Sequence, residues 1–135
     1  MADKTLMIDT TLLIDYFRKT DKANSRLVQL SKQFDQLLIS AVTEFEVYSG
    51  ATNSQLGFWT ELLSEIPVLS FDSHVAHIAV EIQRDLKKLR KTIEKADLFI
   101  AATAVANSLT LETMNRKHFD KIKQLALLKD NNSGG

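Results

Sequence analysis

The chain has 135 residues and no cysteine, which excludes disulfides, thiolate metal centres and cysteine nucleophiles. Its 17 Lys and Arg residues balance 17 Asp and Glu residues, and this formal net charge of zero argues against a protein that coats nucleic acid without specificity. No apolar run approaches the roughly 20 residues that cross a bilayer, and the N-terminus does not resemble a signal peptide, so we expect a cytoplasmic protein with no membrane partner.

The N-terminal half of the chain predicts short apolar strands that lead directly into helices. The apolar run 6–8 is typical of a buried strand, and apolar residues at helical spacing after Asp9 predict that a helix follows at once. Ser40 and Thr43 are both candidate caps for a later helix. In chain order we expect a helix over 23–34, a strand at 37–39 and a helix that ends at Gly50.

The C-terminal half continues this alternation. Pro67 lies within a predicted strand at 66–69 and favours an edge position, because proline has no N–H to donate. Asp72 or Ser73 is the expected N-cap of a long helix that continues through Leu86. The other expected elements are a helix over 53–63, an alanine-rich helix over 96–107, and strands at 109–111 and 125–128.

Short strands that alternate with helices are typical of an α/β/α sandwich with a short-stranded, mostly parallel central sheet. With no linker or repeat in the sequence, we expect one domain over 1–129 and a disordered C-terminal tail over 130–135. Parallel sheets bind ligands beyond the carboxyl ends of their strands, so residues that directly follow a strand are the first candidates for a functional site.

Polar side chains stand at several such positions. Asp9 follows the first strand and either caps a helix or faces the crevice. Asp97 is in the first turn of an apolar helix, and Asn115 follows the strand at 109–111. Glu44 and Glu46 point to different faces of one helix, so one of them is expected to face inward while the other is solvated.

Several kinds of site have no support in this sequence. It contains no Walker A loop, no G-x-G-x-x-G and no G-x-S-x-G, and no third ligand accompanies the His74 and His77 pair for zinc. Carboxylates at strand ends remain, and they are the hard oxygen ligands that Mg²⁺ and Mn²⁺ prefer. We therefore expect Mg²⁺ (or Mn²⁺) as the cofactor.

A run of positive charge leads into Asp97. Such a run is either a solvated helix face or a contact surface for RNA phosphates close to a metal centre. The candidate RNA contacts are Lys87, Lys88, Arg90, Lys91 and Lys95, together with Arg116 and Lys117 beside Asn115. No aromatic residues are interleaved with these cations, so stacking of single-stranded bases is not predicted.

Four segments, in this order, resemble the PIN (PilT N-terminus) domain family and especially the VapC toxins of bacterial toxin–antitoxin pairs. They are MIDTTLLID at 7–15, SAVTEFEVYSG at 40–50, IEKADLFIAATA at 93–104 and LTLETMNRKHF at 109–119. In the second segment the family has Glu three residues after Thr, and this spacing selects Glu46 over Glu44. Thr11 stands where the family usually has Asn.

The resemblance implies a PIN-like fold and a metal-dependent endoribonuclease. By this resemblance Asp9, Asp97 and Glu46 are metal ligands, with Glu46 also a candidate general base, and Asn115 completes the catalytic set. Thr10 and Thr113 are then expected to donate hydrogen bonds to the carboxylates. The family often has an acid at the position of Asn115 or His118, and its absence here predicts one firmly held metal ion rather than two.

The same resemblance implies partners. We expect a homodimer, a VapB-like antitoxin that occupies a groove near the first helices, and an RNA substrate such as transfer or ribosomal RNA. Tyr16, Phe45 and Tyr48 are candidates to line the antitoxin groove.

Two alternatives stay open at this point. The chain could be a catalytically weak PIN domain that binds RNA or its antitoxin without cutting. An aspartate-based phosphotransfer domain is less well supported, because Thr11 stands where a phosphatase of that type has a second Asp.

Overall fold

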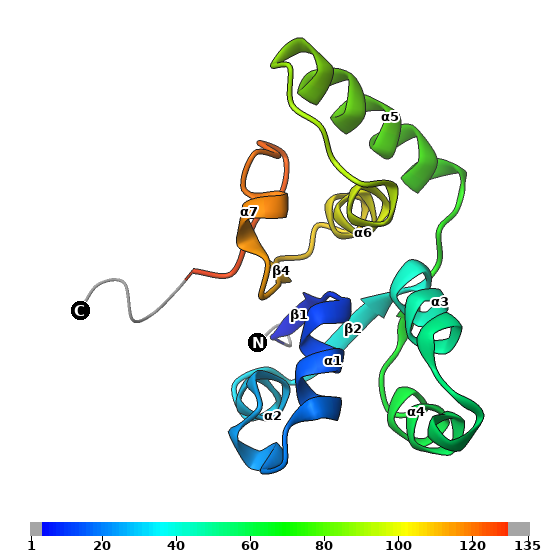
Figure 1. The fold of residues 1–135 in the computed structure, drawn as a ribbon. Coiled ribbons are helices and arrows are strands. Elements are labelled where there is room, and N and C mark those ends of the chain that lie inside the picture. The colour runs from blue at the N-terminus through cyan, green and yellow to red at the C-terminus, as the bar shows by residue number, and fades with distance from the viewer. Residues whose placement is uncertain (1–3, 130–135) are drawn as a thin grey trace.

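The structure is a computed structural model that describes residues 4–129; the expected tail at 130–135 lies outside the described residues. Its centre is a four-stranded parallel sheet in the order β3-β2-β1-β4 (Figure 1). The strands are β1 (Thr5–Ile8), β2 (Gln36–Ser40), β3 (Val68–Leu69) and β4 (Leu111–Glu112). The predicted α/β sandwich with a short, parallel sheet is therefore confirmed, and β3 lies at the edge as Pro67 indicated.

Helices cover both faces of this sheet. They are α1 (Thr10–Arg18), α2 (Arg26–Ser31), α3 (Ala41–Gly50), α4 (Leu56–Leu63), α5 (Ser73–Lys88), α6 (Lys95–Ala106) and α7 (Arg116–Phe119), with 3-10 turns η1 (Lys22–Asn24) and η2 (Asn53–Gln55). None of the described helices is long and apolar enough to cross a membrane.

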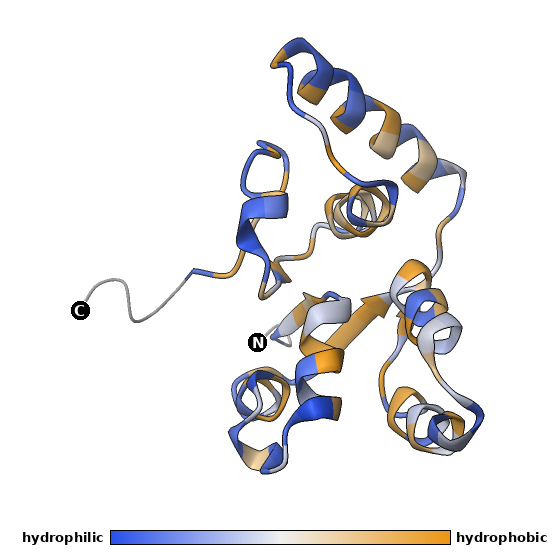
Figure 2. Cartoon of the chain, in the orientation of Figure 1, coloured by the Kyte–Doolittle hydropathy of each residue, from blue (hydrophilic) through white to orange (hydrophobic). Residues whose placement is uncertain are grey.

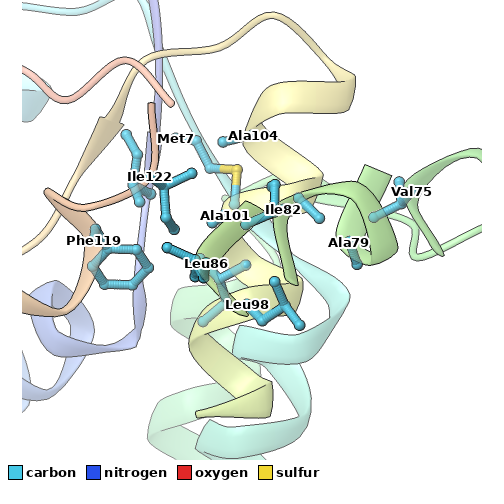
Figure 3. Packing of buried hydrophobic residues seen from close by; sticks show 13 residues of the cluster. Met7, Val75, Ala79, Ile82, Leu86, Leu98, Ala101, Ala104, Phe119 and Ile122 are labelled. Atoms are coloured by element: carbon cyan, nitrogen blue, oxygen red, sulfur yellow. The ribbon is translucent and has the colours of Figure 1, made fainter. Parts of the chain in front are cut away.

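Strand β1 divides the hydrophobic core into two clusters. Its Met7 packs with residues of α5 and α6, while Leu6 and Ile8 pack on the opposite face with residues of α1, α2 and α4 (Figure 3 shows the first cluster). This division follows from the alternation of side chains along a strand. In Figure 2, β2 and most of α6 are hydrophobic, whereas α5 also carries hydrophilic residues along its length. Helix α5 is therefore an outer helix with one buried face, formed by Val75, Ala79, Ile82 and Leu86.

The helices begin at the caps that the sequence indicated. Side-chain oxygens of Asp9, Ser40 and Asp72 accept hydrogen bonds from backbone N–H groups in the first turns of α1, α3 and α5. Because Asp9 directly follows β1 and Ser40 ends β2, each of these strands leads into its helix without a loop.

Several expected elements have other bounds in the structure: the helix expected over 53–63 begins as η2 and continues as α4, and the strand expected at 66–69 is limited to Val68–Leu69. Helix α2 is shorter than 23–34, because Ser25 caps it and the preceding residues form η1. The strand expected at 109–111 becomes Leu111–Glu112, since Leu109 N–H still closes the end of α6 on the carbonyl of Ala104. The strand expected at 125–128 is reduced to one parallel bridge between Leu111 and Leu127.

Lys22 closes the C-terminal end of α1. Its Nζ donates to the carbonyl oxygens of Tyr16 at 2.9 Å, Phe17 at 3.1 Å and Lys19 at 3.2 Å. The same ammonium lies 4.9 Å from the centre of the Tyr16 ring and 5.5 Å from that of Phe58. A cation at this position satisfies orphan carbonyls and the negative end of the helix dipole.

Candidate active site

A cavity of about 590 Å³ lies at the carboxyl ends of β1 and β4, and we call it the acidic cleft. The four candidate catalytic residues all line it: Asp9 after β1, Glu46 on α3, Asp97 on α6 and Asn115 just before α7. Glu44, two positions from Glu46 on the same helix, does not line it. The structure thus brings together side chains that are up to 106 positions apart in the sequence.

Asp9 acts both as a helix cap and as a link between two strands. One carboxylate oxygen accepts from the backbone N–H of Thr11 at 3.1 Å and from the Thr11 hydroxyl, and the other accepts from Thr113 Oγ1 at 2.6 Å. Asp9 is only 2% exposed. Burial raises the pKa of this carboxyl, the hydrogen bonds from Thr11 and Thr113 oppose that rise, and the charge of Asp97 adds to it.

Glu46 is held by a chain of hydroxyl groups. Thr10 Oγ1 lies 2.6 Å from Glu46 Oε1 and 3.2 Å from Thr43 Oγ1, which in turn lies 3.4 Å from Ser40 Oγ. A hydroxyl has one proton, so when Thr10 donates to the carboxylate, Thr43 must donate to Thr10. This order of donors leaves Glu46 Oε2 for another partner.

Asp97 is held by His118. The imidazole Nδ1 lies 3.1 Å from Asp97 Oδ2, and both residues line the acidic cleft. Asp97 does not cap α6, whose N-cap position is Glu94. From the sequence alone, His118 was recognised only as a position where the family often has an acid. Its position three residues after Asn115, one turn along a helix, is the signal that could have placed it in the same site.

The polar residues around the cleft differ partly from those expected. Thr10 and Thr113 donate to carboxylates as predicted, but Thr11 and Thr43 also belong to this network and were missed. None of the seven candidate RNA contacts lines the acidic cleft, and all seven are exposed. The cations that do line it are Arg18 and Lys19.

The donor set fits a divalent metal ion in its chemistry. Carboxylate oxygens from Asp9, Glu46 and Asp97 and an amide oxygen from Asn115 are the hard ligands that Mg²⁺ and Mn²⁺ take. Within residues 4–129, however, no three His, Asp or Glu side chains converge into a ready-made metal cluster. Each acid is hydrogen-bonded to a threonine or histidine partner. Such a site suits an ion that keeps several of its water ligands, as Mg²⁺ does.

Comparison with known proteins places these residues in a family. The family model of the PIN domain matches residues 6–125. Ribonuclease VapC1 of Methanocaldococcus jannaschii is 31% identical over 126 residues, which cover 93% of this chain and 86% of that protein.

Two solved structures share the fold. The structure of DNA-bound VapBC from Salmonella typhimurium superposes with a TM-score of 0.82 at 21% identity, covering 94% of this chain and 98% of that chain. A toxin–antitoxin complex from Klebsiella pneumoniae superposes with a TM-score of 0.71 at 28% identity, covering 90% of this chain and 95% of that chain.

Proposed function

The chain belongs to the PIN domain family, and from this premise we propose that it is a metal-dependent endoribonuclease, the toxin of a VapBC-type pair. The relative at 31% identity is a ribonuclease, and the Klebsiella neighbour is part of a toxin–antitoxin complex. The observation that carries the proposal is the acidic cleft, which Asp9, Glu46 and Asp97 line from three separate elements.

In this proposal Asp9 and Asp97 hold the metal ion. Burial is the main cause of the raised pKa of Asp9, and repulsion by the charge of Asp97 adds to it. A cation bound between the two carboxylates would relieve that repulsion. A bound Mg²⁺ or Mn²⁺ would make its water more acidic and offset charge on the phosphate. The hydrogen bond from His118 keeps the Asp97 carboxylate turned into the cleft.

Glu46 is the proposed general base. Thr10 donates to its Oε1, so Oε2 is the oxygen that accepts the proton of the attacking water. As the water oxygen bonds to phosphorus, the ester bond to the leaving oxygen breaks and that oxygen takes up a proton from a solvent water. Asn115, which lines the same cleft just before α7, would orient the RNA or a water through its amide.

Antitoxin binding is proposed for a second, apolar cavity of about 390 Å³ between α1, α2, β2 and α4. Tyr16 lines it, whereas Phe45 and Tyr48, which were expected to line the same groove, do not. Phe45 is instead 69% exposed on α3. We propose it as part of the surface that a second copy of the chain covers in a homodimer, since exposed aromatic residues are typical of interfaces.

Cleavage of purified total RNA tests the proposed activity. Wild type, Asp97→Asn and the control Glu44→Gln are compared with Mg²⁺, with Mn²⁺ and with a chelator. We expect discrete fragments from wild type and from Glu44→Gln only when metal is present, and intact RNA with Asp97→Asn. Metal-independent cutting, or equal cutting by a folded Asp97→Asn protein, would overturn the assignment.

A catalytically weak, binding-only PIN domain is the second candidate. Two observations favour it: neither Asn115 nor His118 supplies a fourth acid, and the three acids do not converge within residues 4–129. This candidate predicts that the folded protein, freed of antitoxin, binds RNA but leaves it intact under every metal condition.

A further inference from the structure

A cavity of about 580 Å³ adjoins the acidic cleft across the segment that joins β4 to α7, and we call it the basic hollow. Its charged lining consists of four cations and one acid: Lys4, Arg26, Arg116, Lys129 and Glu112. The acidic cleft has the opposite balance, with five carboxylates against two cations. The carboxylates of the cleft therefore repel an RNA phosphate, and the cations of the hollow beside it attract one.

The two arginines of the hollow are held in place by Glu112, which is only 8% exposed. Arg26 donates to Glu112 Oε2 from Nε at 3.1 Å and from Nη2 at 2.9 Å. Arg116 donates from Nη1 to the carbonyl of Leu128 at 2.8 Å and lies 3.8 Å from Glu112 Oε1. A guanidinium has five N–H donors, so these bonds leave donors on both arginines for an anion.

The hollow and the cleft share one short wall. Thr113 lines the hollow, and its hydroxyl donates to Asp9 in the cleft. Asn115 lines the cleft, and the next residue, Arg116, lines the hollow. Because Asn115 and Arg116 are neighbours in the chain, an RNA strand with one phosphate in the cleft has only this wall to cross to reach the hollow.

We propose that the basic hollow binds a phosphate of the RNA backbone adjacent to the one that is cut. The inference rests on the proposed ribonuclease function and adds the path of the substrate. An ion pair with a purely structural role needs one cation for Glu112, whereas two arginines contact it here, and the exposed Lys4 and Lys129 line the same hollow. Pre-positioned guanidinium groups also lose little conformational entropy when they bind phosphate.

The test measures RNA binding separately from cutting. All variants carry Asp97→Asn to prevent cleavage, and binding of a fluorescently labelled single-stranded RNA of mixed sequence is followed by anisotropy over a range of KCl concentrations. The double variant Lys4→Gln/Arg116→Gln removes two charges from the hollow. Its matched control, Arg84→Gln/Lys123→Gln, removes two charges from exposed residues that line neither the hollow nor the cleft.

Each phosphate contact with a single strand contributes about 0.7 to the slope of log K against log salt, so loss of the one contact in the hollow should lower that slope by about 0.7 and weaken binding about 5-fold at roughly 0.1 M salt. Arg116→Lys keeps the positive charge, so it should keep the salt dependence of binding. A variant at this position that binds normally shows that the loss in the glutamine variant comes from the missing charge and not from misfolding. Equal affinities and slopes for the hollow variant and its control would overturn the proposal. So would a polyglutamate peptide that competes as well as RNA of equal charge.

Cleavage of total RNA by the chain with Asp97 intact distinguishes this inference from the proposed function. If RNA is cut but binding does not depend on Lys4 and Arg116, the ribonuclease function is supported and phosphate binding in the basic hollow is refuted. If binding depends on Lys4 and Arg116 but RNA stays intact, phosphate binding in the basic hollow is supported and the ribonuclease function is refuted.

Discussion

Thr113→Val tests whether Asp9 is held as a buried, charged acceptor. Thr113 is 3% exposed, and valine has nearly the same shape without the hydroxyl. The substitution removes the 2.6 Å bond to Asp9. Hydrogen bonds to charged groups contribute about 1.5–3 kcal/mol, so we expect a loss of about 2 kcal/mol at neutral pH. For a chain of this length that loss corresponds to about 7 °C in Tm, taking roughly 2.1 cal/mol/K of unfolding entropy per residue.

The loss should depend on pH. Burial raises the pKa of Asp9, so the folded protein holds this proton more tightly than the unfolded chain does. The stability of wild type therefore falls as pH rises from about 4 through the folded pKa. Thr113 opposes the rise in pKa, so its loss raises the pKa of Asp9 further and deepens that fall. When Asp9 is protonated the bond is a neutral one, and the cost of its removal shrinks to about 1 kcal/mol.

Thr103→Val is the matched control. Thr103 is also fully buried, but its hydroxyl donates to the uncharged carbonyl of Phe99 at 2.8 Å. Chemical denaturation at acidic and at neutral pH should show a small, pH-independent loss for the control and a larger, pH-dependent loss for Thr113→Val. If both variants lose the same stability at both pH values, Asp9 is not a charged acceptor.

Three further predictions follow from other contacts. Asp9→Asn should abolish both RNA cleavage and any increase of Tm with Mg²⁺, since it removes a carboxylate proposed to hold the metal ion; a folded variant that still gains Tm with Mg²⁺ would contradict this. Glu46→Gln should reduce cleavage by about 10²-fold or more, whereas Glu44→Gln should be nearly silent, and the reverse result would show that the wrong glutamate was chosen. Lys22→Met should cost about 2 kcal/mol in urea unfolding through its lost carbonyl and ring contacts, and an equal loss from the exposed Lys19→Met would refute that account.

Local chemistry was the part of the fold that could be predicted. Asp9, Ser40 and Asp72 cap helices through backbone groups two or three positions away, so their effect is visible in the sequence. The strand at 125–128 failed because its pairing depends on a partner, Leu111, that forms a single bridge with it. Apolar residues at strand-like spacing do not by themselves supply such a partner.

The residues of the candidate site could also be predicted from the sequence, but their long-range contacts could not. The four residues expected in it do line one cleft, although their roles stay predictions. What could not be predicted is the set of long-range contacts: Arg26 meets Glu112 across 86 positions, and Thr10 meets Glu46 across 36. Such pairs depend on how the elements pack, and no local spacing encodes them.

The pairing of β1 with β4 has a consequence for when the protein becomes active during synthesis. Strand β1 and Asp9 leave the ribosome before β4, yet Asp9 receives its bond from Thr113, 104 positions later. Chains emerge from the N-terminus, so a nascent chain holds an exposed β1 edge and an incomplete site until β4 and Thr113 have been made. If the protein is a toxin, its own translation thus postpones its harm, and an antitoxin that is already present has time to meet it.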